Sequence, residues 1–124
     1  MKGALAFPSH TPDCSATGIR SSVDQALSIL GDVKKIDIFE LARIDPDVDV
    51  VESMKCLKEL VAEGKIGGVG LSEVKASTIR KAHEVWPLTM VENELSLFSR
   101  DDIANGVLET CKERKSFTRI IRLA

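Results

Sequence analysis

The stretch Ile36–Glu73 limits the folds open to this chain more than any other feature. It contains two short apolar segments, IDIFELA and IGGVGL, separated by about a dozen residues whose apolar side chains recur at helical spacing. That order predicts a strand, a crossover helix and a second strand. Two strands joined by a crossover helix run parallel, so the chain is predicted to contain a parallel α/β sheet.

The same alternation continues on both sides of this stretch. The periodicity predicts helices over residues 18–30, 49–63, 76–86 and 103–114, and strands over residues 36–42, 66–71 and 88–91. Gly31 is expected to end the first helix, and Asp49 with Glu52 resembles a capping box at the start of the second. This pattern fits a doubly wound sheet and a barrel equally well.

Composition narrows the class of function. The net charge of −2 supplies no basic stripe to neutralise phosphates, so nucleic acid is not an expected partner. Three widely spaced cysteines favour reduced thiols in the cytoplasm, and Cys56 and Cys111 are expected in the core. The two histidines have no partners at ligand spacing, so no metal site is predicted. No apolar run is long enough to cross a membrane, and MKGALAF is too short for a signal-peptide core.

The two ends depart from the pattern. MKGALAF resembles the second half of a strand. SFTRIIRLA has the composition of a strand, but its arginines interrupt the apolar run expected of a buried parallel strand. We therefore expect both ends to be cut.

The glycines between Gly64 and Gly70 do not form a phosphate-binding loop. Such a loop follows a strand and opens a helix, whereas these glycines lie between a helix end and a strand. Gly64 is expected to end the helix, and Gly67 and Gly68 to leave room inside a curved sheet.

Polar residues follow the second and third strands. Ser72 and Glu73 come directly after one strand, and Glu92 and Glu94 occupy the corresponding end of the next. The carboxyl ends of parallel strands are where ligands bind in such folds. These side chains either contact a ligand or merely begin loops.

The blocks IDIFELARIDPD, ESMKCLKELVAEGKIGGVGLSE and ENELSLFSRD resemble the middle of an aldo-keto reductase, in particular its fungal pyridoxal reductase branch. The resemblance covers roughly residues 2–115. It implies one reductase domain over residues 1–115 and a divergent tail over residues 116–124, where SFTRIIRLA replaces the seventh strand expected after Lys115. It implies a partial (β/α)8 TIM barrel, about strands three to six with their helices. It also implies NADPH-dependent reduction of an aldehyde or ketone, such as pyridoxal, without a metal.

The resemblance assigns roles to individual residues. Lys2 matches the active-site lysine, which would lower the pKa of a proton-donating tyrosine. Ser72 and Glu73 match the serine and asparagine that hold the nicotinamide carboxamide, with Glu in place of Asn, and Glu92 falls where a glutamine binds the same group. The family's usual histidine falls at Ala42, which has no polar side chain.

Other parts of the family's site have no counterpart here. The chain contains no tyrosine, and a barrel of this type needs about 250 residues. We therefore expect a reductase fragment that is weakly active or inactive. Two alternatives remain: a non-catalytic half-barrel that self-associates through its exposed sheet edges, and the product of a misread gene.

Overall fold

The computed structural model describes residues 12–94 and 104–121, and at Glu94 and residues 117–121 it describes the backbone alone. The chain alternates helix and strand throughout. The elements are, in order, α1 (Ala16–Leu30), β1 (Ile36–Leu41), α2 (Val50–Ala62), β2 (Ile66–Ser72), α3 (Ala76–Val85), β3 (Met90–Glu94), α5 (Val107–Glu113) and β4 (Phe117–Ile121).

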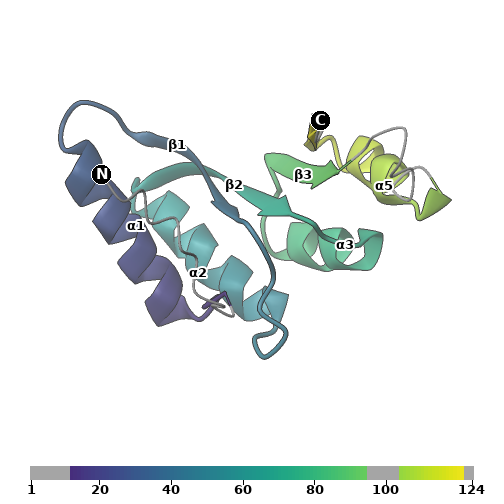
Figure 1. Ribbon diagram of the computed structural model, residues 1–124, viewed down its shortest axis with the longest axis horizontal. Helices are drawn as coiled ribbons and strands as arrows, with labels where there is room; N and C mark the ends of the chain where they lie inside the picture. Colours follow the sequence, from purple (N-terminus) through teal and green to yellow (C-terminus); the bar gives the residue numbers. More distant parts are fainter. Residues whose placement is uncertain (1–11, 95–103, 122–124) are drawn as a thin grey trace, which may run out of the picture.

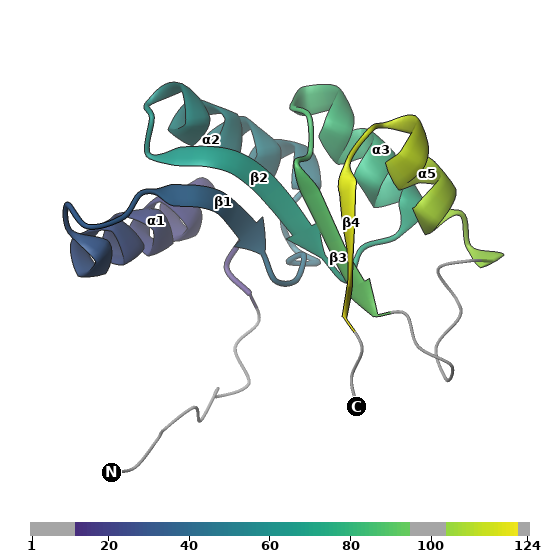
Figure 2. The ribbon, with the colours of Figure 1, turned by 90° about the horizontal axis from the view of Figure 1, so that it is seen from above.

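The strands form one parallel sheet in the order β1-β2-β3-β4. Figure 1 shows α2 and α3 beneath the strands, and Figure 2 shows the sheet curving away from α2, α3 and α5, which cover one face. Helix α1 packs beside α2 at the β1 end. None of the described helices lies on the other face, which we call the open face.

The core lies between the helices and the covered face of the sheet. Because side chains alternate along a strand, every second residue of β2 and β3 points to the helices. Val69, Leu71 and Val91 do so and are fully buried. The helices contribute residues at a period of three or four, which are also fully buried: Ile19, Val23, Met54, Leu57, Leu60, Ile79, Ala82 and Val107.

Helices α1 and α2 begin and end mostly as the sequence predicts. Ser15 begins α1 by accepting a hydrogen bond from the N–H of Gly18, and Gly31 ends it with a φ of 56°. Asp49 caps α2 as predicted, but its carboxylate accepts from Val51 N–H. Glu52 forms an ion pair with Lys55, with 2.7 Å between Oε1 and Nζ, where the capping box predicted a bond back to the cap.

Most predicted boundaries agree with the structure to within two residues, and two differ by more. The third strand ends at Glu94 instead of Val91, and the last helix begins at Val107, after Asn105 and Gly106. Gly106 has a φ of 83°, and the Asn105 side chain accepts the N–H of Val107 at 3.1 Å. This Asn-Gly turn starts the helix later than its apolar pattern indicates. Ile103, predicted at its start, lies outside the described residues.

Buried cysteines behave as small apolar residues. Cys14, Cys56 and Cys111 are all buried and free, which confirms the core positions predicted for Cys56 and Cys111. Burial raises the pKa of the Cys14 and Cys56 thiols. Their Sγ atoms lie 3.3 Å from the Arg43 carbonyl and 3.6 Å from the Ala16 carbonyl, respectively.

Helices α1 and α2 are also joined by ion pairs. Arg20 Nη2 lies 2.6 Å from Glu59 Oε2 and Arg20 Nη1 lies 2.9 Å from Glu63 Oε1, while Lys65 Nζ lies 2.7 Å from Asp24 Oδ1. These groups are partly exposed, so each pair contributes little to stability. The ion pairs orient α1 on α2, and the contact between these two helices is formed mainly by apolar side chains.

We predict that His83 makes the fold sensitive to acid. Its Nδ1 accepts the N–H of Leu88 at 3.2 Å and so fixes the turn that leads into β3. Burial, with a smaller effect of the Arg114 charge, lowers the pKa of His83 below its usual value of 6.5. The unfolded chain therefore binds this proton more readily, and the stability is complete above about pH 6.5 and declines below it.

The measurement is the free energy of unfolding at pH 7.5 and pH 5.5 by urea titration. We expect His83→Gln, which keeps an acceptor but does not titrate, to lose less stability between these pH values than the unmodified chain. An equal loss in both proteins would show that His83 contributes nothing to the acid sensitivity.

Candidate nicotinamide-binding edge of the sheet

The carboxyl ends of β2 and β3 bring two predicted site residues together. Ser72 and Glu92 are register partners in neighbouring strands, one residue beyond the buried pair Leu71 and Val91. Because Leu71 and Val91 face the helices, Ser72 and Glu92 face the open side. Ser72 is 8% exposed and Glu92 is half-buried. The two side chains therefore form one polar edge at the mouth of the sheet.

Glu73 stands apart from this edge. Its side chain is exposed, and its backbone has a φ of 54°, in the left-handed region. The Glu73 N–H donates to the Glu92 carbonyl at 2.9 Å, which extends the β2–β3 pairing by one residue. The turn then carries the chain off the sheet towards α3. Of the four polar side chains predicted to converge here, Ser72 and Glu92 do so, and the side chain of Glu94 lies outside the described part.

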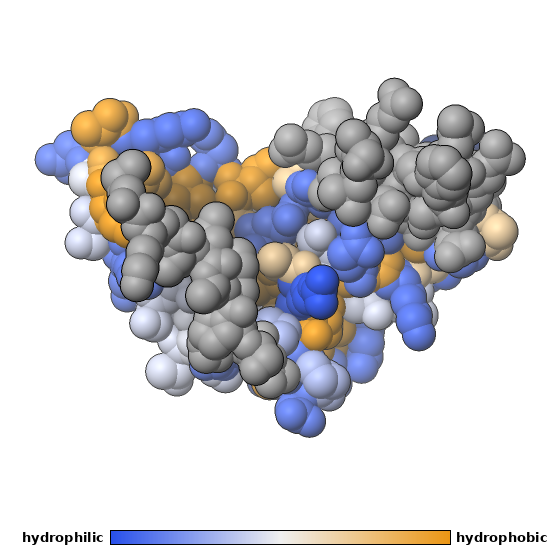
Figure 3. Space-filling model, in the orientation of Figure 1, coloured by the Kyte–Doolittle hydropathy of each residue, from blue (hydrophilic) through white to orange (hydrophobic). Residues whose placement is uncertain are grey.

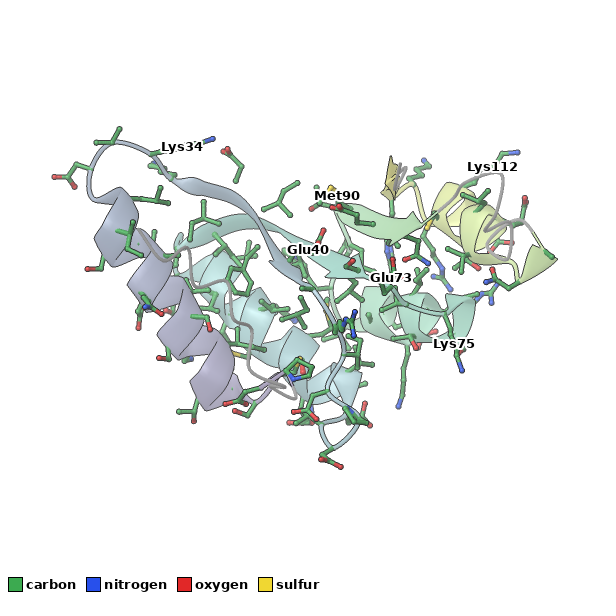
Figure 4. The ribbon with its side chains drawn as sticks, in the orientation of Figure 1. Lys34, Glu40, Glu73, Lys75, Met90 and Lys112 are labelled. Atoms are coloured by element: carbon green, nitrogen blue, oxygen red, sulfur yellow. The ribbon has the colours of Figure 1, made fainter. Side chains whose placement is uncertain are left out.

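A second row of residues lies on the same open face, two positions earlier along each strand. Glu40, Gly70 and Met90 are consecutive register partners across β1, β2 and β3. A Cβ at Gly70 would lie 3.3 Å from both Cβ and Cγ of Glu40, so the glycine makes room for this glutamate over β2. Figure 4 labels Glu40 and Met90 beside these strands. Sequence analysis did not identify Glu40 as part of this surface.

The glycines of β2 serve the curved sheet, as predicted. A Cβ at Gly68 would lie 2.5 Å from Thr89 Oγ1, and one at Gly67 would lie 2.7 Å from the Asp37 carbonyl oxygen. Gly64, with a φ of 72°, lies just beyond the end of α2. Gly67 and Gly68 therefore allow neighbouring segments of the chain to approach β2 closely.

Asn93 was not recognised from the sequence as a structural residue. It is 6% exposed and points to the helix side, between Glu92 and Glu94. Its Nδ2 donates to the Val74 carbonyl at 3.1 Å, and its Oδ1 accepts the Val74 N–H at 3.2 Å. The amide thereby satisfies both backbone groups of a buried loop residue and holds the β2–α3 loop against β3. Its position two residues after Val91, on the buried side of the strand, is the sequence feature that could have identified it.

The end of β1 offers no polar side chain at the corresponding place. Ala42 follows the strand and is exposed. The loop beyond it is ordered by Asp45, whose buried carboxylate accepts the N–H of Asp47 at 2.9 Å. Within residues 12–94 and 104–121, no group of three potential ligands is placed to hold a metal ion, and no helix is long and apolar enough to cross a membrane.

The chain is similar to known proteins over most of its length. The sequence pattern of the aldo/keto reductase family matches residues 5–120. The chain belongs to the aldo/keto reductase family. It is 42% identical over 113 residues to "Probable pyridoxal reductase 2" of Schizosaccharomyces pombe and 43% identical over 120 residues to "Putative pyridoxal reductase" of Saccharomyces cerevisiae. These alignments cover 91% and 90% of this chain but 34% of each relative. The chain thus spans about a third of their length.

Solved structures of aldo-keto reductases have the same fold. A glycerol dehydrogenase from Gluconobacter oxydans superposes with a TM-score of 0.80 at 26% identity, over 87% of this chain and 32% of that chain. The predicted partial (β/α)8 barrel is therefore confirmed. Predicted strands four to six are β1, β2 and β3, whereas the segment predicted as strand three lies outside the described residues.

The reductase segment also includes part of the predicted tail. Phe117–Ile121 forms β4, parallel to β3, where the resemblance places the seventh strand. The strand alternative for SFTRIIRLA is thus the one that the backbone adopts. Lys2, predicted as catalytic, lies outside the described residues, so its role stays a prediction, as do the cofactor roles of Ser72, Glu73 and Glu92.

We predict that Glu73→Asn stabilises the fold by about 0.5–1 kcal/mol, because asparagine adopts the left-handed conformation more easily than glutamate. Urea unfolding of the variant measures this gain. Glu73→Gln is the matched control, since it removes the charge without favouring a positive φ. Equal stability of the two variants would contradict the backbone explanation.

We predict that Asn93→Ala destabilises the fold by about 2–4 kcal/mol, because it leaves the Val74 N–H and carbonyl without their partner in a buried place. Asn93→Asp retains an acceptor for the N–H but not a donor for the carbonyl, so its ionised side chain should not restore full stability. Chemical unfolding measures both. A loss below about 0.5 kcal/mol for Asn93→Ala would show that water replaces the amide.

Proposed function

We propose that this chain carries the nicotinamide-binding edge of an NADPH-dependent aldo-keto reductase that reduces an aldehyde such as pyridoxal. The observation that supports this most directly is the placement of Ser72 beside Glu92 on the open face, at the carboxyl ends of adjacent parallel strands. The names of the fungal relatives support the choice of pyridoxal.

The chemistry of these two side chains fits a carboxamide. The Ser72 hydroxyl can donate to an amide oxygen, and the Glu92 carboxylate can accept from an amide nitrogen. Both belong to strand ends that are fixed by register and by the Glu73–Glu92 backbone bond. Nicotinamide, when bound, supplies the hydride. The role of Ser72 and Glu92 is then to hold the ring in one orientation against the mouth of the sheet.

Reduction also requires a proton for the carbonyl oxygen. The 124 residues contain no tyrosine, and Ala42 offers no hydrogen bond to orient the carbonyl. We propose that Lys2 has the lysine role implied by the family resemblance, which is to favour ionisation of a neighbouring proton donor. Without such a donor, the chain should retain part of the cofactor contacts and have little or no turnover.

We predict that Ser72→Ala weakens binding of NADPH about 3- to 10-fold, the value of one lost hydrogen bond. Titration of the chain with NADPH, followed by cofactor fluorescence or by NMR shifts of the β2 and β3 amides, measures the change. The matched control is Ser28→Ala, since Ser28 is exposed in the last turn of α1, which precedes the start of β1 and not the carboxyl ends of the strands.

An equal effect of the two substitutions, or NMR shifts confined to residues away from β2 and β3, would contradict this assignment. Turnover is tested separately, by following NADPH oxidation in the presence of pyridoxal. A rate near that of a complete aldo-keto reductase would refute the expected loss of catalysis without affecting the binding assignment.

A further inference from the structure

Two carboxyl groups lie near the proposed nicotinamide edge, on the open face of the sheet. Glu92 is the register partner of Ser72 at the end of β3. Glu40 lies on β1 in the row before, in register with Gly70. Both glutamate side chains are half-buried. None of the ion pairs formed among residues 12–94 and 104–121 includes Glu92, so these residues do not compensate its charge.

Glu40 reaches from β1 over the neighbouring strand. A Cβ at position 70 would lie 3.4 Å from its Oε2 atom, so Gly70 leaves the space that this carboxyl group occupies. The same oxygen is shielded from water. Ser72 follows two residues later on the same face, roughly 7 Å further along β2. Glu40 therefore acts on the mouth of the sheet through a medium that screens charge less than water does.

The surroundings of the two glutamates favour an organic cation over a metal ion. Within the described residues, no group of three potential ligands is placed to hold a metal. Ile38 and Met90, both half-buried, face the same open side. Figure 3 shows hydrophilic atoms next to an apolar patch in the middle of the molecule, where strands β1 and β2 of Figure 1 lie. A positively charged aromatic ring suits such a surface, because its faces are apolar and carboxylates attract its charge.

We propose that Glu92 and Glu40 make this edge selective for the oxidised nicotinamide ring, which carries a positive charge, over the reduced ring, which carries none. The inference rests on the proposed function, in which Ser72 and Glu92 hold the carboxamide. The carboxamide is bonded directly to the ring, so a carboxylate that accepts its hydrogen bond lies close to the ring charge. The glutamine that the family resemblance implies at position 92 would accept the same bond without supplying a charge.

The two carboxylates also affect the reduction itself. Glu92 and Glu40 stabilise the positive charge that develops on the ring when hydride leaves it. The register of β1, β2 and β3 fixes the backbone of both residues in advance, so the sheet need not rearrange during the reaction. Tighter binding of the oxidised cofactor then opposes its exchange for the reduced cofactor.

The test compares the affinities of the 124-residue chain for NADP+ and for NADPH by isothermal titration calorimetry. We expect the unmodified chain to bind NADP+ several-fold more tightly. Glu92→Gln should lower the ratio of the two affinities about 10-fold, and Glu40→Gln, which lies further from the edge, about 3-fold. Tighter binding of NADPH by the unmodified chain would overturn the proposal. An unchanged ratio in either variant would overturn the assignment of that residue.

Each glutamine keeps the size of the glutamate and an acceptor oxygen, so the ratio of affinities reports the charge alone. Glu84→Gln is the matched control, since Glu84 is exposed in the last turn of α3, which leads to the start of β3 and not to the carboxyl ends of the strands. This control should leave the ratio unchanged. An equal fall in all three variants would show that the net charge of the chain is responsible, and would overturn the proposal.

Salt dependence tests the charge effect in the unmodified chain, so it does not depend on any variant folding. Both cofactor forms carry the same phosphates, and the ratio of their affinities therefore isolates the ring. Added salt screens partly exposed charges, so the ratio should fall towards one as the salt concentration rises. A ratio that does not respond to salt would contradict selection by charge.

Failure of this inference can be distinguished from failure of the proposed function. Binding of neither cofactor form would overturn both. If Ser72→Ala weakens the binding of both forms while the two glutamine variants leave the ratio unchanged, the carboxamide assignment stands and selection by charge is wrong. A purely structural role of Glu92 or Glu40 gives this second result, because a loosened edge weakens both forms equally.

Discussion

Burial of one face of β2 is the constraint on which the rest of this structure depends. Val69 and Leu71 have no exposed surface on the face of β2 that packs on α2, and side chains alternate strictly along a strand. The alternate residues of β2, which are Ile66, Gly68, Gly70 and Ser72, must then face the other way. The glycines at 68 and 70 and the hydroxyl of Ser72 are on the open face for this reason. A slip of one residue would bury Ser72 beneath the helices and expose Leu71.

This constraint also explains which parts of the fold could be predicted. Helical spacing and short apolar runs were sufficient for the order of the elements and the direction of the sheet, because those patterns are what the core selects. Local polar chemistry was less predictable. Glu52 has the position of a capping-box residue but pairs with Lys55, and the Asn105–Gly106 turn delays α5. In both cases a short-range contact outweighs a pattern defined by spacing alone.

The candidate site was only partly accessible to sequence reasoning. Position after the strands indicated Ser72 and Glu92, and register confirms that they are neighbours. Spacing could not show that Glu73 leaves the sheet with a positive φ, or that the side chain of Asn93, on β3, holds the β2–α3 loop. Both facts depend on the three-dimensional course of the β2–α3 connection. If position 73 corresponds to the asparagine that the resemblance implies, a glutamate there changes the backbone preference as well as the side chain.

The proposed cofactor edge is the last of three rows of residues on the open face. Ile38 lies lowest along the strands, Glu40 and Met90 form the next row, and Ser72 with Glu92 form the last row at the carboxyl ends. In a closed barrel the lower rows fill the interior, and the last row opens at the mouth where ligands bind. A closed barrel of this family would thus leave Ser72 and Glu92 accessible at its mouth while it encloses Ile38. Barrel closure and cofactor binding are compatible because they involve residues at different positions along the strands.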